Sequence, residues 1–262
     1  MKPIYAILNF LLFYGSTQAQ DILRPIKYLT TDNGLSQAIN YSILKDSKEL
    51  VWITSYDGLN KFDSRKITPY RNMLQDSTSF KGTLSMGLVE DENHNVWCGS
   101  NDELNVYIRN RNYFKHVNFN NTDNSLYIPL ISYSNNILFK KGDNLFTCDI
   151  NTYQIKKITV ALPEELLKYT PKVFESNSSF YIFFYQNRCY PALNLQPVLK
   201  YWKLKNDFTK AHIIYKQTDA NQYHDVIDLN NGNYILGTNN GLLNLILSLM
   251  SFCLLPRIKF KK

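Results

Sequence analysis

The stretch VWITSYDGLN, residues 51–60, is repeated in outline 45 residues later as VWCGSNDELN, residues 96–105. Each copy places a tryptophan in a short apolar run, follows it with a polar turn, and ends on a Leu-Asn pair. Runs rich in β-branched and aromatic residues, bounded by turn formers, are typical of short β-strands joined as hairpins. The repeat therefore predicts an all-β architecture made of equivalent units.

The sequence around each copy divides into four short strands. In the first unit, residues 34–72, we expect strands at 39–45, 50–55, 59–63 and 67–71. In the second unit, residues 82–119, we expect them at 85–90, 96–100, 104–108 and 113–119. Four antiparallel strands at an interval of about 45 residues are typical of the blades of a β-propeller.

Later copies of the unit are fainter. The hairpin is kept in residues 127–160, where Phe139 is expected at the tryptophan position, and hydrophobic alternation alone supports residues 171–217. The motif returns at 222–247. The sequence thus predicts one β-propeller domain over residues 20–247, with about five blades. The residues that define the repeated motif are Trp52, Gly58, Leu59, Asn60, Trp97, Leu104, Asn105 and Gly237.

The motif residues have structural explanations. The second strand of a blade is covered on both faces, so Trp52 and Trp97 are expected to fill the space between sheets rather than to stack on a ligand. Gly58 allows a tight turn with positive φ. Glu103 stands at the corresponding position of the second copy, so we expect that turn to differ, with Asn101 or Asp102 as the left-handed residue.

These blades resemble the two-component regulator propeller repeat, found in the periplasmic sensor region of hybrid two-component sensor histidine kinases of Bacteroidetes. The resemblance is carried by Gly34-Leu35-Ser36, Asp46 to Ile53, and Asp57 to Asp63. It is strong over residues 26–119, recurs at 230–243 and is weak between them. It implies a seven-bladed extracytoplasmic sensor of oligosaccharides that is joined, in that family, to membrane, kinase and DNA-binding parts. On this resemblance the chain is expected to be an N-terminal fragment without a kinase, and not an enzyme.

The two ends of the chain differ from the blades. Residues 1–19 combine a lysine, an apolar segment and small residues at Thr17 and Ala19, which is typical of a secretory signal peptide and predicts a periplasmic location. The alternative is a buried N-terminal helix. Residues 248–262 form an apolar and then basic tail, which we interpret as a truncated or frameshifted end. The alternative is a membrane stop, although the apolar run of 14 residues is shorter than the roughly 20 that span a bilayer.

Closure of the propeller has two alternatives. Residues 25–30 resemble the fourth strand of a blade, whereas the last unit has only three expected strands. Pairing residues 26–29 with residues 242–247 would remove two exposed sheet edges and close a five-bladed ring. The other hypothesis is an open, incomplete arc of a seven-bladed design.

Ligand contacts in a propeller gather where loops meet at one end. The loops between second and third strands carry aromatic, amide and carboxylate side chains that suit sugar hydroxyls, and the connection 72–82 belongs to the same end. The alternative is that these are ordinary turn residues. The candidate ligand-binding residues are Tyr56, Asp57, Asn101, Asp102, Asn239 and Asn240.

Composition weighs against other classes of function. The net charge is +7, but basic residues are spread along the chain, so no nucleic-acid partner is expected. The four cysteines form no CxxC pair, so we expect no metal or cofactor. We expect the cysteines to be buried free thiols rather than to form one disulfide. The expected partner is an oligosaccharide. A homodimer is expected only through further domains, and contact with a membrane only if the tail inserts into it.

Two alternatives to a sensor stay open. One is an envelope propeller that binds other proteins. The other is a glycan-active hydrolase or lyase on the same scaffold, which would need converging arginines, a tyrosine nucleophile and a carboxylic acid. The arginines of this chain fall mostly on outer hairpins, which weighs against the enzyme.

Overall fold

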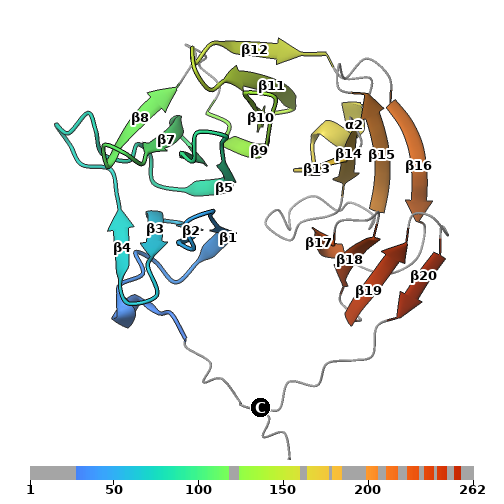
Figure 1. Cartoon of the computed structure of the whole chain (residues 1–262), viewed down its shortest axis with the longest axis horizontal. Helices are drawn as coiled ribbons and strands as arrows, with labels where there is room; N and C mark the ends of the chain where they lie inside the picture. Colours follow the sequence, from blue (N-terminus) through green and yellow to red (C-terminus); the bar gives the residue numbers. More distant parts are fainter. Residues whose placement is uncertain are drawn as a thin grey trace, which may run out of the picture.

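The computed structural model contains five four-stranded antiparallel sheets, and in each sheet the strands are adjacent in chain order. The sheets follow one another around an arc, with the first strand of each nearest the middle and the fourth on the outside (Figure 1). The residues described are 28–117, 124–159, 164–176, 179–184, 199–205, 211–217, 223–229, 233–238, 241–246 and 251–254.

The strand bounds of the first three sheets are as follows. The first sheet holds β1 (Asn40–Lys45), β2 (Val51–Ser55), β3 (Gly58–Phe62) and β4 (Ile67–Tyr70). The second sheet holds β5 (Ser85–Glu90), β6 (Val96–Ser100), β7 (Leu104–Ile108) and β8 (Tyr113–Val117). The third sheet holds β9 (Tyr127–Tyr133), β10 (Asn136–Lys141), β11 (Asn144–Asp149) and β12 (Ile155–Ile158).

Two further sheets complete the arc. The fourth sheet holds β13 (Lys172–Ser176), β14 (Ser179–Phe184), β15 (Leu199–Lys205) and β16 (Ala211–Gln217). The fifth sheet holds β17 (Tyr223–Asp228), β18 (Asn233–Thr238), β19 (Gly241–Ile246) and β20 (Ser251–Leu254). A 3-10 turn, η1 (Thr31–Asn33), precedes the first sheet, and a single helical turn, α2 (Glu164–Leu167), precedes the fourth. The predicted all-β fold with four-stranded antiparallel units is confirmed.

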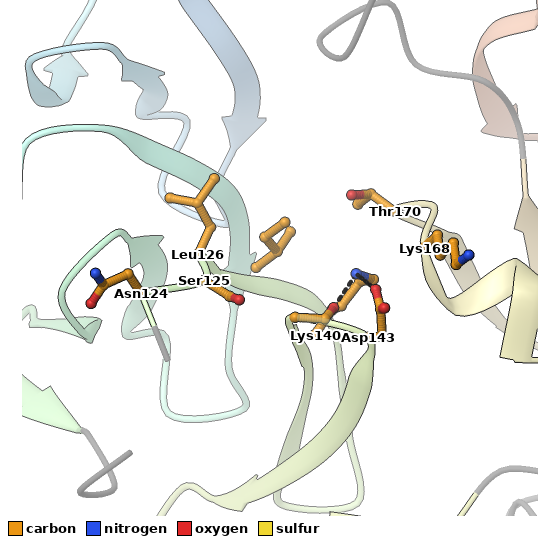
Figure 2. Close-up of a pocket in the computed structure, with 9 residues that line it drawn as sticks. Asn124, Ser125, Leu126, Lys140, Asp143, Lys168 and Thr170 are labelled. Atoms are coloured by element: carbon orange, nitrogen blue, oxygen red, sulfur yellow. Dashed lines mark hydrogen bonds and ion pairs between the residues drawn. The ribbon is translucent and has the colours of Figure 1, made fainter. Parts of the chain in front are cut away.

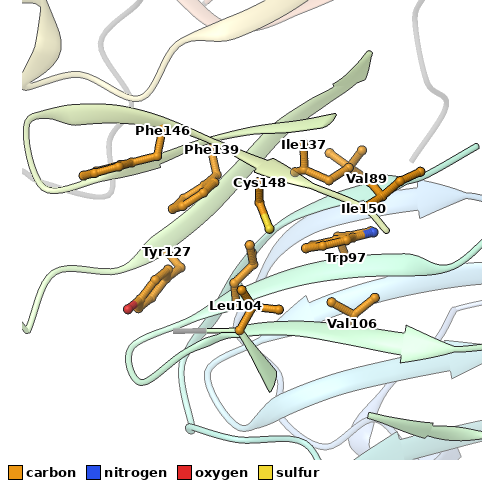
Figure 3. Packing of buried hydrophobic residues seen from close by; sticks show 11 residues of the cluster. Val89, Trp97, Leu104, Val106, Tyr127, Ile137, Phe139, Phe146, Cys148 and Ile150 are labelled. Carbon is orange, nitrogen blue, oxygen red and sulfur yellow. The ribbon is translucent and has the colours of Figure 1, made fainter. Parts of the chain in front are cut away.

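The core lies between consecutive sheets. Trp52, Val96 and Tyr107 belong to a buried cluster between the first and second sheets. Trp97 packs in a second cluster with side chains of the third sheet, including Phe139 (Figure 3). A third cluster joins the third and fourth sheets. Rings of the fourth and fifth sheets meet at Phe183 and Tyr234, whose centroids are 4.9 Å apart. Burial between sheets, as in a propeller, holds the chain together.

The register of the third sheet corrects one prediction. Leu104 pairs with Gly99 in the second sheet and Leu145 pairs with Lys140 in the third, so the position of Trp97 corresponds to Leu138. Leu138 indeed faces the following sheet, as the tryptophans do, whereas Phe139 packs against the preceding one. The expectation of Phe139 at that position was wrong by one residue, which in a strand exchanges the two faces.

The fifth sheet corrects another prediction. Its last unit was expected to have three strands, and one of the two hypotheses for closure paired residues 26–29 with residues 242–247. Instead, β20 pairs with β19 through Leu243↔Leu254 and Ile246↔Ser251, so the tail itself supplies the fourth strand. Part of the apolar run is therefore β-structure, and within the described part of the chain no helix is long and apolar enough to cross a membrane. Residues 1–27, which include the predicted signal peptide, lie outside the described residues.

Both cysteines with described side chains are free thiols. Cys98 and Cys148 are buried in the clusters on the two faces of the second sheet. Burial raises the pKa of the Cys98 thiol and raises that of Cys148 to about 12. These side chains therefore pack as small apolar groups, as predicted for buried cysteines.

Candidate functional site

The repeated aspartate and tryptophan form one local unit in each of the first two sheets. Oδ2 of Asp46 accepts a hydrogen bond from Nε1 of Trp52, and Oδ2 of Asp91 accepts one from Nε1 of Trp97, both at 2.7 Å. In each turn the other carboxylate oxygen accepts two backbone N–H groups. A buried indole N–H needs such an acceptor. These residues therefore have a structural role and are not available to a ligand.

The repeated asparagine fastens the segment that leads into its own sheet. Oδ1 of Asn60 accepts the backbone N–H of Ser36 at 2.8 Å, and Oδ1 of Asn105 accepts that of Lys81 at 2.8 Å. Both asparagine side chains are fully buried. We call these two contacts the asparagine clamps. They fix the connections at the end of the sheet where the candidate ligand-binding turns lie.

The candidate residues of the first sheet lie in the turn between β2 and β3. Tyr56 is 54% exposed. Asp57 accepts a hydrogen bond from Nε of Arg71 at 2.7 Å, and both of these side chains are nearly half exposed. Gly58 has φ of +86° and would meet the Tyr70 carbonyl at 2.1 Å if it carried a Cβ atom. Asp57 is thus engaged in holding the turn against the end of β4, and Tyr56 is the exposed side chain there.

The candidate residues of the second sheet lie between β6 and β7. Oδ1 of Asn101 accepts the backbone N–H of Thr83 at 2.9 Å, and its amide group donates to Asp102 at 2.6 Å. Gly58 in turn donates its N–H to the Thr83 carbonyl at 2.7 Å. The structure therefore links the two turns through Thr83, in the connection between the first two sheets. Asn239 and Asn240 lie outside the described residues.

The predicted left-handed residue in the second turn was wrong. Neither Asn101 nor Asp102 has a positive φ. The turn is instead held by Ser100, whose Oγ accepts the backbone N–H groups of Asp102 and Glu103 at 3.2 and 3.0 Å. A serine hydroxyl that accepts nearby backbone N–H groups can shape a turn without a left-handed residue.

A pocket of about 290 Å³ lies at the equivalent end of the third sheet. One side is formed by the lead-in to β9, with Asn124, Ser125 and Leu126, and by Ile128. Lys140, near the end of β10, and Asp143, in the turn that follows it, stand in the middle, and Lys168 and Thr170, between α2 and β13, stand across from them (Figure 2). Gly142 of the same turn also lines the pocket. We call this the third-sheet pocket.

The charges of the third-sheet pocket centre on a buried lysine. Lys140 is only 7% exposed, whereas the side chain of Asp143 is 64% exposed. Nζ of Lys140 donates to the Gly142 carbonyl and lies 4.0 Å from Oδ1 of Asp143. Burial lowers the pKa of Lys140, and the Asp143 carboxylate partly opposes that shift. A buried ammonium with a long ion pair is a group that another acceptor or anion would stabilise.

The neighbouring lysine has a different role. Lys141 is 2% exposed, its Nζ donates to the Ser125 carbonyl at 2.9 Å, and it lies 4.4 Å from the centroid of the Tyr127 ring. In the third sheet this lysine fastens the lead-in segment, as the asparagine clamps do in the first two. The two adjacent lysines point to opposite faces, as successive residues of a strand do.

The third-sheet pocket was missed from the sequence, although its end of the sheet was predicted. The available signal was the run Lys140-Lys141-Gly142-Asp143, in which two lysines occupy strand positions that are apolar or small in the other copies. Within the described residues, no group of three or more histidine, cysteine, aspartate or glutamate side chains could hold a metal ion.

Comparisons with known proteins identify one relative by sequence and several solved structures with a similar fold. No family model matches the chain. A stretch of 76 residues is 36% identical to "Histidine kinase P4" of Formosa agariphila, and this stretch covers 29% of the chain and 6% of the kinase. A chain described as the extracellular domain of the hybrid two component system BT3049 from B. thetaiotaomicron matches 87% of this chain, with a TM-score of 0.61 and 17% identity.

Two other solved structures share the fold. The extracellular domain of the one component system BT4673 from B. thetaiotaomicron matches 84% of the chain, with a TM-score of 0.58 and 15% identity. A chain of a nidogen/laminin complex matches 81% of it, with a TM-score of 0.54 and 10% identity. This chain spans 31% and 28% of the two bacterial chains and 78% of the nidogen/laminin chain. The resemblance to extracellular domains of hybrid two-component systems is confirmed at the level of the fold.

Proposed function

We propose that this chain is the extracytoplasmic sensor propeller of a two-component regulatory system, that it recognises oligosaccharides, and that it represents the N-terminal part of a longer sensor. The observation that carries the proposal is the match of 87% of the chain to the extracellular domain of a hybrid two component system. The 36% identity to a histidine kinase over 76 residues supports the same assignment. The signal-peptide pattern of residues 1–19 supports export.

We further propose that the five sheets are blades of an incomplete propeller. Ile43 and Leu88 occupy the same position in the first and second units, but Ile43 is 73% exposed whereas Leu88 packs against the cluster between the first two sheets. At the other end of the arc, Ile227 is 56% exposed, whereas its counterpart Val89 is buried. Both end sheets thus expose an aliphatic residue that a neighbouring sheet would cover.

Thermal unfolding of the purified chain with a panel of neutral and acidic oligosaccharides tests the proposed recognition. A ligand at about 100 times its Kd stabilises the folded state by about 2.7 kcal/mol, which corresponds to a rise in Tm of several degrees. Sucrose at equal mass concentration is the control, because excluded sugars stabilise proteins without a site. The expected result is a shift that saturates in the millimolar range or below for one class of glycan.

The opposite result would be that no oligosaccharide shifts Tm beyond the sucrose control. The protein-interaction alternative would then be tested by capture of envelope proteins on the immobilised chain, with and without sugars. Hydrolysis or cleavage of any panel member, followed by chromatography, would instead indicate the glycan-active enzyme.

A further inference from the structure

The third-sheet pocket has the size and polarity of a site for a small molecule. Its volume of about 290 Å³ is at the lower end of the ~300–1,000 Å³ typical of ligand sites. This space suits one or two sugar units rather than a long chain. The pocket is formed by three segments that are far apart in sequence, namely the lead-in to β9, the β10–β11 turn and the α2–β13 connection.

The charges in the pocket favour an anion. Lys140 and Lys168 contribute two positive groups against the single carboxylate of Asp143. An ammonium group has three N–H donors, and Asp143 lies at 4.0 Å from Nζ, beyond hydrogen-bonding distance. A ligand carboxylate could therefore form a charge-assisted hydrogen bond with Lys140 and a second contact with the exposed Lys168.

The remaining walls favour a ligand with hydroxyl groups and an apolar face. Asn124, Ser125 and Thr170 carry amide and hydroxyl groups, which donate to and accept from hydroxyls. Leu126 and Ile128 supply an apolar wall. Sites for small molecules commonly combine such apolar walls with a few polar groups that fix orientation.

From this geometry we propose that the third-sheet pocket binds a small hydroxylated carboxylate, the terminal uronic-acid unit of an acidic oligosaccharide, through Lys140 and Lys168. The proposal rests on the proposed sensor function only in taking the ligand to be a sugar. It places the recognition site in the third sheet, whereas Tyr56 and Asn101 lie in turns of the first and second sheets.

Isothermal titration calorimetry on the purified full chain tests this inference. The probes are D-glucuronate, D-galacturonate and their unsaturated or saturated disaccharides, with D-glucose, D-galactose, acetate and inorganic phosphate as comparisons. We expect the acidic sugars to bind at least about tenfold more tightly than the neutral sugars or the bare anions, because one charge-assisted hydrogen bond distinguishes them from the neutral sugars and the hydroxyl contacts distinguish them from the bare anions.

Three variants locate the binding. Lys168→Gln alters an exposed side chain and is expected to weaken acidic-sugar binding about tenfold while leaving the fold intact. Lys140→Met is expected to abolish the preference for acidic over neutral sugars, and circular dichroism checks that it folds. Lys156→Gln is the matched control, since this lysine is exposed on β12 of the same sheet outside the pocket and should leave binding unchanged.

The results separate this inference from the proposed function. Three outcomes would each overturn the pocket assignment. They are equal affinities for glucose and glucuronate, acetate or phosphate binding as tightly as the acidic sugars, and an equal loss of affinity in Lys156→Gln and Lys168→Gln. If none of the acidic probes binds while another oligosaccharide raises Tm, the pocket assignment fails and the sensor proposal stands. If neither experiment detects a sugar, both fail.

Discussion

The aspartate of each repeat explains why a tryptophan and a polar turn recur together. Six residues before the tryptophan, Asp46 and Asp91 place one carboxylate oxygen on the indole N–H and the other on backbone N–H groups of the turn. The left-handed residues Glu49 and His94, with φ of 64° and 62°, also occupy equivalent positions. The tryptophan recurs in the two copies as part of this unit, and its ring fills the space between sheets.

Asp46 also accepts a hydrogen bond from Arg109, and its lowered pKa makes the stability of the fold depend on pH. Burial would raise the pKa of this carboxyl, but hydrogen bonds from Arg109, Trp52 and the turn N–H groups outweigh burial and hold the pKa below the ordinary value of 3.8. Because the pKa is lower in the folded than in the unfolded chain, the stabilisation is complete above about pH 4. It is lost as the pH falls through the folded-state pKa.

Replacing Asp46 by asparagine tests this linkage. We expect Asp46→Asn to lower the free energy of unfolding by about 1–3 kcal/mol at pH 7, since charge-assisted hydrogen bonds are lost. The difference from the wild type should shrink below pH 4, where the wild-type carboxylate becomes protonated. Urea unfolding at pH 7, 5, 4 and 3 measures the free energy of unfolding of the wild type and of the variant. The control is Asp102→Asn, in an exposed turn, whose free energy of unfolding should stay within about 0.5 kcal/mol of the wild-type value. A difference that is constant with pH would contradict the assignment.

At the scale of the elements, the second and third sheets approach each other closely at a glycine. A Cβ atom on Gly99 in β6 would lie 1.6 Å from the carbonyl oxygen of Tyr127, at the start of β9. The φ angle of Gly99 is not in the left-handed region, so the reason for glycine there is space alone. Gly237 is its counterpart in β18, where it pairs with Leu242 as Gly99 pairs with Leu104.

Two glycine variants separate space from backbone conformation. Gly99→Ala is expected to lower the free energy of unfolding by about 3 kcal/mol or more, because the backbone of the third sheet must move. Gly34→Ala meets nothing closer than 3.6 Å but has φ of +105°, so it should cost only about 1–2 kcal/mol. Chemical denaturation of both variants measures the two costs. Equal losses would indicate that Gly99 is not at a close contact.

The strong copies of the repeat made their elements predictable, and the weak copies did not. In the first two sheets every strand begins and ends within about two residues of its expected bounds. The first two sheets join their first and second strands by a five-residue connection that begins with the aspartate. In the third sheet a tight turn at Ser134 and Asn135 replaces this connection, and Leu138 replaces the tryptophan. Without those markers the sequence could not fix the register, and the prediction of Phe139 was wrong by one residue.

The sequence predicts at which end of the sheets a ligand site would lie, but not which residues of the third-sheet pocket form it. Strand alternation places all the turns between second and third strands at equivalent ends, and Tyr56 and Asn101 lie in two of these turns. The third-sheet pocket also needs the connection that carries Lys168 and Thr170, and this segment follows no repeat. Its position depends on tertiary packing, which a pattern of 45 residues does not encode.

At the scale of the whole molecule, the exposure of the end sheets distinguishes an arc from a ring. Ile43→Ser and Leu88→Ser change equivalent positions in the first and second sheets. In an open arc Ile43→Ser should change the free energy of unfolding by less than about 0.5 kcal/mol, whereas Leu88→Ser should lower it by about 1–3 kcal/mol. Urea unfolding of the two variants compares them directly. Similar losses would show that another sheet covers Ile43.

The asparagine clamps have a consequence for how the chain reaches its fold. Each one joins residues only 24 positions apart, and the aspartate–tryptophan contact spans six. A sheet and its lead-in can therefore form as soon as one unit of chain is available, before the next unit is complete. Such short-range contacts favour rapid folding in order from the N-terminus. A chain that emerges gradually from a ribosome or a secretion channel would then form one sheet at a time. At each stage only the most recently formed sheet would expose an apolar face that the next sheet covers.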